Sequence, residues 1–405
     1  MASTINANNT TGLVSTADTS GILQLQTNGT TAVTVDASQN VALAANVSSV
    51  GTINCPNTFG FKNRILNGSM VLDQRNAGAS VSITASPQYT LDRWAAIASL
   101  ASKFTIVQTV GAVAAPTGFS NYLAATSSSA YSVGASEQFA FRQSIEGLNV
   151  VDLAWGTANA KTVTLSFWAR SSLTGTFGGV LLNSAGNRSY PYTYTINSAN
   201  TWEQKSVTIA GDTSGTWLTT NGVGIIVQFG LGVGTTLSGT AGAWSGSNFQ
   251  SATGAVSVVG TNGATLYITG VQLEVGTVAT SFDYRSYGTE LLLCARYFEA
   301  IVLNSYSVTG QAYSTSGGEA PIYYTVQKRT TPTITLPAAG SGSGLIAFTT
   351  SSGNYPTTIG THATAGISTN KFNIQGSGYT AAFTAGNAIL LFSSGNSTVQ
   401  VSAEL

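Results

Sequence analysis

Apolar and polar residues alternate in short stretches along most of this chain. Val163, Leu165 and Phe167 occupy every second position, and Phe139 and Phe141 do the same further upstream. Side chains two residues apart lie on one face of a β-strand, so these stretches predict strands with one buried face. We therefore expect an all-β protein.

Other stretches fit the same architecture. Residues Val223–Gly234 form the most apolar window and predict a buried strand that is too short to cross a membrane. Residues Ala264–Val275 predict a strand interrupted at Gly270, and Ser189–Ile196 predict one with alternating tyrosines. Regularly spaced strands separated by turns favour an antiparallel sandwich, here a jelly roll over residues 59–286.

One segment has helical periodicity. Residues Tyr287–Ala300 carry apolar side chains at three- and four-residue spacing, with Ser286 as the N-cap and Glu290 in the first turns. We interpret this segment as a short linker helix between two β domains. Its apolar stripe consists of Leu291, Cys294, Ala295 and Phe298.

Beyond the helix, short apolar stretches separated by Gly-Ser turns continue to the end of the sequence. They predict a second, smaller sandwich, so residues 287–405 combine the linker helix with a C-terminal β-sandwich. The predicted strands cover residues 300–313, 320–327, 333–336, 345–350, 371–374, 381–383 and 388–392.

Residues 1–58 differ from the rest because they contain no aromatic residue and only two charges, Asp18 and Asp36. Leucines and valines alternate with polar residues on both sides of Asn28-Gly29, which is a strong hairpin signal. Strands this small bury too little apolar area to offset their ordering entropy. We therefore expect this segment to pair with other copies of the chain, as an attachment or shaft element.

Charge is scarce throughout the chain. Charged residues make up 7% of the sequence, with 15 Lys and Arg against 15 Asp and Glu, where soluble domains carry about 25%. A nucleic-acid-binding protein needs a basic excess, so no nucleic acid is expected as a partner. A neutral surface limits the solubility of a monomer, which favours an oligomer. No secretory signal peptide and no membrane span are expected.

Several blocks of the sequence resemble a virion-surface module of tailed bacteriophages. They read FKNRILNGSMVLDQRN at Phe61–Asn76, YTLDRWAA at Tyr89–Ala96 and LSFWARSS at Leu165–Ser172, and they continue through Ile268–Glu299. The segment Gly21–Leu43 is similar to the attachment and shaft segments of the same proteins. Such modules occur in tail fibres and in related appendages attached to the head or the tail.

This resemblance implies a homotrimeric tail fibre or tail-attached appendage on the virion surface, assembled in the host cytoplasm. It implies attachment to other virion proteins through residues 1–58 and contact with host surface polysaccharide. The alternative is a head fibre or capsid decoration protein. A depolymerase tailspike is a third interpretation, but the long repeats and clustered carboxylates that it usually needs are not evident.

The central domain is also similar in layout to jelly-roll carbohydrate-binding modules. Sugar binding needs aromatic planes beside amide or guanidinium groups. The candidate residues are Trp168, Arg170, Tyr190, Tyr192, Tyr194, Gln138 and Arg142. The alternative is that these aromatic rings belong to the sandwich core or to a subunit interface.

No enzyme activity, cofactor or metal is expected. The carboxylates form no close sequence pair of the kind that glycoside hydrolysis uses, and Asp92-Arg93 and Asp283 with Arg285 look structural. His362 is the only histidine, which makes a catalytic triad or a transition-metal site unsupported. Cys55 and Cys294 are expected to be free buried thiols. A structural Ca²⁺ is an alternative that no acidic loop supports.

Overall fold

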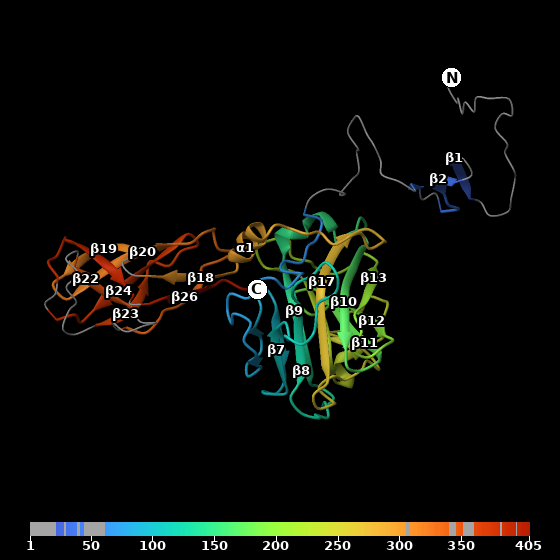
Figure 1. The fold of residues 1–405 in the computed structure, drawn as a ribbon, viewed down its shortest axis with the longest axis horizontal. Helices are drawn as coiled ribbons and strands as arrows, with labels where there is room; N and C mark the ends of the chain where they lie inside the picture. The colour runs from blue at the N-terminus through green and yellow to red at the C-terminus, as the bar shows by residue number, and fades with distance from the viewer. Residues whose placement is uncertain are drawn as a thin grey trace, which may run out of the picture. The chain divides into compact units, whose positions relative to one another are not determined.

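A computed structural model of the 405-residue chain describes residues 22–27, 30–38, 41–43, 61–304, 308–339, 346–350, 360–380, 383–393 and 395–405. The chain divides into two compact units, residues 1–58 and residues 59–405. Regular structure is almost entirely β-strand in both units (Figure 1), so the all-β prediction is confirmed.

The first unit contains a three-stranded antiparallel sheet. Its strands are β1 (Leu23–Thr27), β2 (Thr30–Val35) and β3 (Val41–Leu43), in that order across the sheet. The turn predicted at Asn28-Gly29 lies outside the described residues, although the two strands that it would join do pair. The register places six aliphatic side chains on one face of this sheet: Leu23, Leu25, Val33, Val35, Val41 and Leu43.

Residues 61–286 form a sandwich of two six-stranded antiparallel sheets. The first sheet has the order β13 (Glu203–Ile209), β10 (Val163–Ser171), β17 (Thr265–Val275), β8 (Leu123–Ser127), β7 (Phe104–Gln108) and β4 (Val81–Ser82). The second has the order β12 (Ser189–Ile196), β11 (Gly175–Leu182), β14 (Val223–Val233), β9 (Gln138–Glu146), β6 (Ala95–Ala98) and β5 (Gln88–Tyr89). A short parallel pair, β15 (Ser238–Gly239) and β16 (Ser251–Ala252), and 3-10 turns at Gly147–Asn149, Val151–Leu153 and Thr235–Leu237 complete the domain.

The sandwich core follows the alternation seen in the sequence. Val163, Leu165 and Phe167 of β10 face Phe139 and Phe141 of β9 across one buried apolar cluster, as predicted. The apolar window becomes β14, which is buried along nearly its whole length. Burial of this many large side chains, at about 25 cal/mol per Å² of apolar surface, is the main source of stability for the domain.

The predicted interruption of β17 is a β-bulge at Gly270. Strand β10 pairs with β17 on both sides of this point, and the register shifts between Ser166 and Trp168. Gly270 has a φ of 60°, and a Cβ atom there would lie 2.6 Å from Cζ of Phe119. Glycine is therefore needed for both the backbone conformation and the close approach of the Phe119 ring.

The predicted linker helix is α1 (Tyr287–Ala295), the only α-helix among the described residues. It ends five residues earlier than expected, because Phe298–Leu303 forms strand β18 and pairs with β26 (Ser397–Ser402). Phe298, which was expected on the helix, is buried in that strand. Helical spacing alone did not reveal this pairing partner, which lies about a hundred residues away.

The C-terminal strands form the second, smaller sandwich that the sequence predicts. One sheet has the order β18, β26 and β21 (Thr333–Thr335). The other has the order β22 (Ala347–Thr350), β25 (Ala388–Phe392), β19 (Val308–Ser314), β20 (Gly317–Tyr323), β24 (Lys371–Ser377) and β23 (Thr361–Ala365). Side chains of both sheets share one buried apolar cluster. The single strand expected at residues 300–313 is divided into β18 and β19, and the turn expected at 340–344 lies outside the described residues.

Candidate functional site

The seven side chains that the sequence suggests for sugar binding are spread over three places. The three tyrosines of β12 point into the core between the sheets. Gln138 and Arg142 lie on β9 of the second sheet, whereas Trp168 and Arg170 lie on β10 of the first. Because the two sheets are opposite layers of the sandwich, β9 and β10 present their outer faces on opposite sides of the domain. The structure therefore does not combine these residues into one site.

The tyrosine stripe is part of the core. Tyr190, Tyr192 and Tyr194 are 8%, 1% and 5% exposed, and the Tyr194 ring packs edge-on against Phe167 with centroids 4.9 Å apart. The Tyr192 hydroxyl donates a hydrogen bond of 2.9 Å to the carbonyl of Gln228, and burial raises its pKa. A sugar cannot stack on rings that the protein already covers. The core interpretation, which the sequence left open, applies to these three residues.

Trp168 and Arg170 lie on the outer face of the first sheet. The strand register places Trp168 between Gln204 of β13 and Thr269 of β17, and Arg170 opposite Tyr267. The Arg170 Nε donates to the carbonyl of Asn200 at 3.0 Å, and its guanidinium lies 5.4 Å from the centre of the Tyr267 ring. Trp168, Arg170 and Gln204 are called the β10 surface below.

Trp168 differs from the other tryptophans of the chain. The indole N–H groups of Trp94, Trp155, Trp202, Trp217 and Trp244 each donate to a backbone carbonyl. The half-buried Trp168 has no such acceptor and no aromatic neighbour among the described residues. Buried indole N–H groups usually have a hydrogen-bond acceptor within the protein. Because the N–H of Trp168 has none among the described residues, it can donate to an external ligand. Gln204, which lies opposite Trp168 in the strand register, has no sequence signal that would mark it as its neighbour.

Arg142 occupies the opposite outer face. It lies between Ala95 of β6 and Gln228 of β14, and no described residue forms an ion pair or hydrogen bond with its half-buried guanidinium. Burial lowers its pKa. Gln138 lies at the start of the same strand, and its buried amide oxygen lacks a hydrogen-bond partner among the described residues. Arg142 is thus a polar side chain on the opposite side of the sandwich from the β10 surface.

Every described Asp and Glu side chain from Asp73 onward accepts a hydrogen bond within the protein. Asp212, for example, accepts two bonds of 2.7 Å from Arg188. Burial acts to raise the pKa of Glu146, but hydrogen bonds from Arg296 and Tyr297 outweigh it and lower the pKa. The surroundings of Glu146 thus stabilise its ionised form, which is the opposite of what a general acid for glycoside hydrolysis requires.

Buried titratable groups outside this set also have structural surroundings. His362 shares a hydrogen bond with the Tyr379 hydroxyl, and burial lowers its pKa to about 4. Cys294 is a buried free thiol whose pKa is raised by burial, while Cys55 lies outside the described residues. Within the described ranges, no group of three or more His, Cys, Asp or Glu side chains could hold a metal ion. No helix among them has the length and apolar character that a membrane crossing requires.

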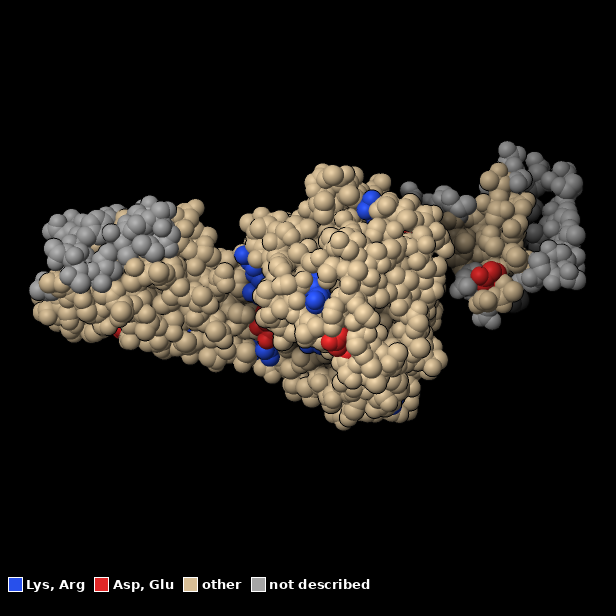
Figure 2. Space-filling view, turned by 90° about the horizontal axis from the view of Figure 1, so that it is seen from below, with Lys and Arg blue, Asp and Glu red and all other residues tan. Residues whose placement is uncertain are grey.

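Charged side chains gather where the two sandwiches of the second unit meet (Figure 2). Glu404, near the C-terminus, accepts from Arg75 at 2.8 Å and also pairs with the almost fully buried Arg93. The Arg93 guanidinium lies 3.6 Å from the centre of the Tyr297 ring. Asp92, whose pKa is raised by burial, instead accepts two bonds from Gln74. The Asp92-Arg93 motif is therefore structural, as expected, but Glu404 was not recognisable as its partner.

A second predicted ion pair belongs to the same junction. Arg285 lies 3.8 Å from Asp283 and 3.2 Å from Glu290 of α1, and it also donates to backbone carbonyls of the segment that follows residue 60. Glu274 accepts from the backbone and the hydroxyl of Thr280 nearby. These contacts attach α1 to the central sandwich, in agreement with the fold-locking role expected from the sequence.

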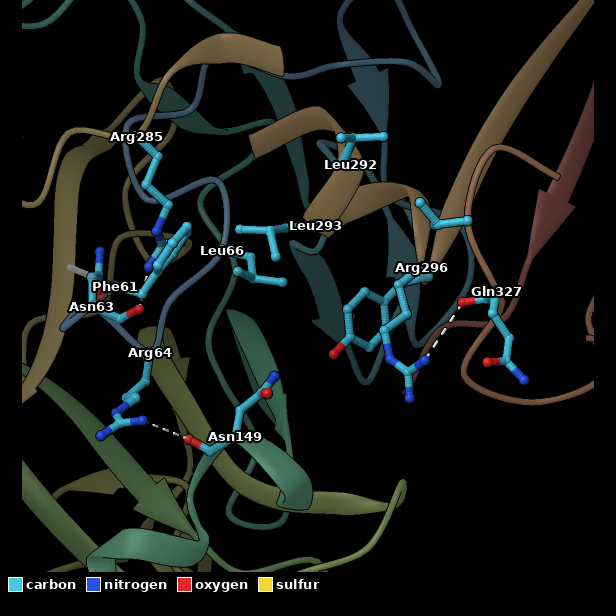
Figure 3. Close-up of a pocket in the computed structure, with 12 residues that line it drawn as sticks. Phe61, Asn63, Arg64, Leu66, Asn149, Arg285, Leu292, Leu293, Arg296 and Gln327 are labelled. Atoms are coloured by element: carbon cyan, nitrogen blue, oxygen red, sulfur yellow. Dashed lines mark hydrogen bonds between the residues drawn. The ribbon is translucent and has the colours of Figure 1, made fainter. Parts of the chain in front are cut away.

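A pocket of about 470 Å³ opens beside this junction (Figure 3). Its lining comes from the segment at 61–66, the 3-10 turn at 147–149, helix α1 with the residues that flank it, and the loop at 326–327. Arg64, Arg285 and Arg296 line it, and no carboxylate does. The acidic partners of these arginines, Asp152, Glu290 and Glu146, lie outside the lining. The full lining is Phe61, Asn63, Arg64, Leu66, Asn149, Arg285, Leu292, Leu293, Arg296, Tyr297, Val326 and Gln327.

Comparison with known proteins gives similarity in chain fold only. No family model matches the chain. No curated protein matches it either. Among solved structures, tailspike protein 4 of bacteriophage CBA120 (enzymatically active domain) has a TM-score of 0.28 at 13% identity, over 53% of this chain and 22% of that one.

Two sugar-binding structures are similar at the same level. A putative sugar binding protein from Bacteroides thetaiotaomicron has a TM-score of 0.32 at 14% identity, over 53% of this chain and 100% of that one. The module TmCBM61, solved with β-1,4-galactotriose, has a TM-score of 0.26 at 11% identity, over 53% and 100%. At these values the likeness bears on neither the ligand nor the activity of the present protein.

Proposed function

We propose that this chain is a bacteriophage virion structural protein, a homotrimeric tail fibre or tail-attached appendage that binds host surface glycan through the β10 surface. The proposal rests mainly on Trp168, the one tryptophan whose indole N–H has no acceptor among the described residues. A non-enzymatic role fits the carboxylates of the described residues, which are engaged in hydrogen bonds or ion pairs.

The chemistry of the β10 surface suits a sugar ring. The apolar C–H face of a sugar can stack on the exposed part of the Trp168 ring, since aromatic side chains offer large rigid contact areas. The Gln204 amide, directly across the strand pair, can donate to and accept from hydroxyl groups. Arg170 has N–H groups beyond the one used for Asn200. Few charges surround them, so this surface suits the hydroxyl groups and C–H faces of the polymer.

Removing the Trp168 ring tests this site. Trp168→Ala should weaken binding to a host polysaccharide about tenfold, the equivalent of about 1.4 kcal/mol, whereas Trp168→Phe should keep most of the affinity. Candidate glycans would first be found on an array of bacterial polysaccharides and then titrated by calorimetry. Trp244→Phe, a tryptophan change away from this surface, is the matched control, with circular dichroism to verify the fold.

Two outcomes would contradict the proposal. One is the absence of binding to any bacterial polysaccharide at millimolar sugar concentration. The other is binding that Trp168→Ala leaves unchanged, which would remove the β10 surface as the site.

Attachment to the particle is assigned to residues 1–58. The aliphatic face of the β1–β3 sheet is open, with Leu23 60%, Leu25 43%, Val41 62% and Leu43 48% exposed. A sheet with one bare apolar face gains stability by covering it, and identical copies or other virion proteins are the available partners. The same face would equally suit flat packing on capsid subunits, so a head fibre or capsid decoration protein is the second candidate. Cryo-electron microscopy of the particle would separate the two by the position of this segment.

A further inference from the structure

The junction pocket combines features that the β10 surface lacks. Three guanidinium groups line it, and their acidic partners pair with them from outside the cavity. Arg64 and Arg296 are the more accessible, with side chains 20% and 31% exposed, while Arg285 is 5% exposed. The cavity is therefore lined by basic side chains and by none of their acidic partners.

Free hydrogen-bond donors remain on the two accessible arginines. A guanidinium carries five N–H groups. Arg64 uses two of its own, one for the carbonyl of Asn149 and one for Asp152. Arg296 gives Nε and Nη2 to Glu146, and only a long contact of 3.5 Å joins its Nη1 to the carbonyl of Gln327. Donors that can take a second anion are therefore present at both ends of the pocket (Figure 3).

We infer that this pocket binds a sugar residue that carries a carboxylate, as part of a host polysaccharide. The inference rests on the proposed glycan-binding function and names a second subsite for it. A planar carboxylate matches the fork of N–H groups on a guanidinium, which is why arginine is the usual partner for it.

The other residues that line the pocket suit the ring of a sugar whose carboxylate is held by the arginines. Phe61 is an exposed aromatic at the rim, and the Arg285 guanidinium lies 5.5 Å from the centre of its ring. Leu66 and Leu293 lie in the middle of the cavity between the two arginine-lined ends (Figure 3). The side chain of Asn149 points into the same space and has no hydrogen bond to another described residue. An aromatic plane, an apolar floor and a free amide are what a sugar with both C–H and hydroxyl faces needs.

A pair of matched sugars tests the carboxylate. D-glucuronate and D-glucose differ only at C6, and each would be titrated into the full chain with observation by NMR. Glucuronate should bind in the millimolar range, and glucose at least tenfold more weakly. Raising NaCl from 20 to 300 mM should weaken glucuronate binding several-fold, because salt screens the attraction to the arginines.

A pair of matched variants tests whether glucuronate binds in the junction pocket. Asn149→Asp puts a carboxylate into the pocket at constant size and should weaken glucuronate binding at least tenfold. Asn149→Ala, which removes the amide without adding charge, should weaken glucuronate binding clearly less than Asn149→Asp does. Arg64→Gln, at an ion pair on the surface, should also weaken it.

The results also separate this inference from the proposed function. Equal binding of glucose and glucuronate, or glucuronate binding that Asn149→Asp does not change, overturns the pocket assignment even if Trp168→Ala still weakens polysaccharide binding. A third compound, N-acetylglutamate amide, would be titrated in the same way as a model of an acidic peptide. If it binds as tightly as glucuronate, the pocket recognises an acidic side chain of a protein partner and the sugar assignment is wrong.

Discussion

Glu404 shows how one residue can stabilise a junction between domains. Its carboxylate is almost fully buried and accepts from Arg75 and from Arg93, which is itself 1% exposed. Arg329 donates to the carbonyls of residues 403 and 404, so the chain terminus is held from several sides. A buried ion pair contributes little net stability when intact, but losing one partner leaves an uncompensated charge in the interior.

Neutralising this acceptor should therefore be costly. Glu404→Gln should lower the free energy of unfolding by about 3 kcal/mol, because Arg93 stays charged and buried without its counter-ion. Glu319→Gln is the matched control, since Glu319 only accepts bonds from two amides and should cost less than about 1 kcal/mol. Urea unfolding followed by circular dichroism measures both. A Glu404→Gln variant as stable as the control would show that the Arg93 charge is compensated in another way.

At the scale of elements, the bulge in β17 determines what the outer face of the first sheet presents. The shift at Gly270 changes which β17 residues lie opposite β10, so that Trp168 faces Thr269 while Ser166 faces Gln272. It also makes room for Phe119, whose ring packs against Phe282 and Tyr284 at 5.1 and 5.6 Å. The bulge is thus a structural requirement of the β10 surface.

Two glycine substitutions separate backbone strain from the Phe119 contact. Gly254 also has a positive φ of 77°, but nothing lies within 4 Å of a Cβ there, so Gly254→Ala should cost only about 1 kcal/mol. Gly270→Ala adds a clash with the Phe119 ring and should cost about 3 kcal/mol. Tryptophan fluorescence during urea unfolding measures this domain, because all six tryptophans lie in it. Equal costs for the two variants would mean that the Phe119 ring moves away freely.

At the scale of the whole molecule, the proposed assembly and the proposed glycan recognition belong to different units of the chain. Residues 59–405 form a compact unit with two buried cores, so we expect them to fold without residues 1–58. The β1–β3 sheet instead exposes its aliphatic face, and few charges elsewhere on the protein oppose association.

Removing residues 1–58 should therefore change assembly and leave the fold intact. We expect the 59–405 protein to be monomeric by light scattering, to keep its tryptophan spectrum and to be missing from particles, whereas the full chain should be a trimer. Leu25→Gln with Leu43→Gln in the full chain should have the same effect on assembly, because it makes the open face polar. Normal incorporation of the truncated protein into particles would refute the anchoring role.

The sequence by itself determined which residues become strands and where the cores lie. Alternation at Val163, Leu165 and Phe167, the apolar window of β14 and the helical spacing after Ser286 are local patterns, and local patterns reflect which face of an element is buried. Tertiary structure decided what those patterns leave open. Tyr192 and Trp168 both lie in strands with alternating side chains. Only the stacking of the sheets shows that the Tyr192 ring is covered and that the Trp168 ring is accessible.

Contacts between distant segments decided the rest of the site. Glu404 pairs with Arg93 across 311 residues, β26 ends the helix early by pairing with β18, and the junction pocket takes its walls from four separate segments. Each depends on the register of strands and on how two domains pack. Spacing along one chain carries no information about these, because they are set by side chains that meet only after folding.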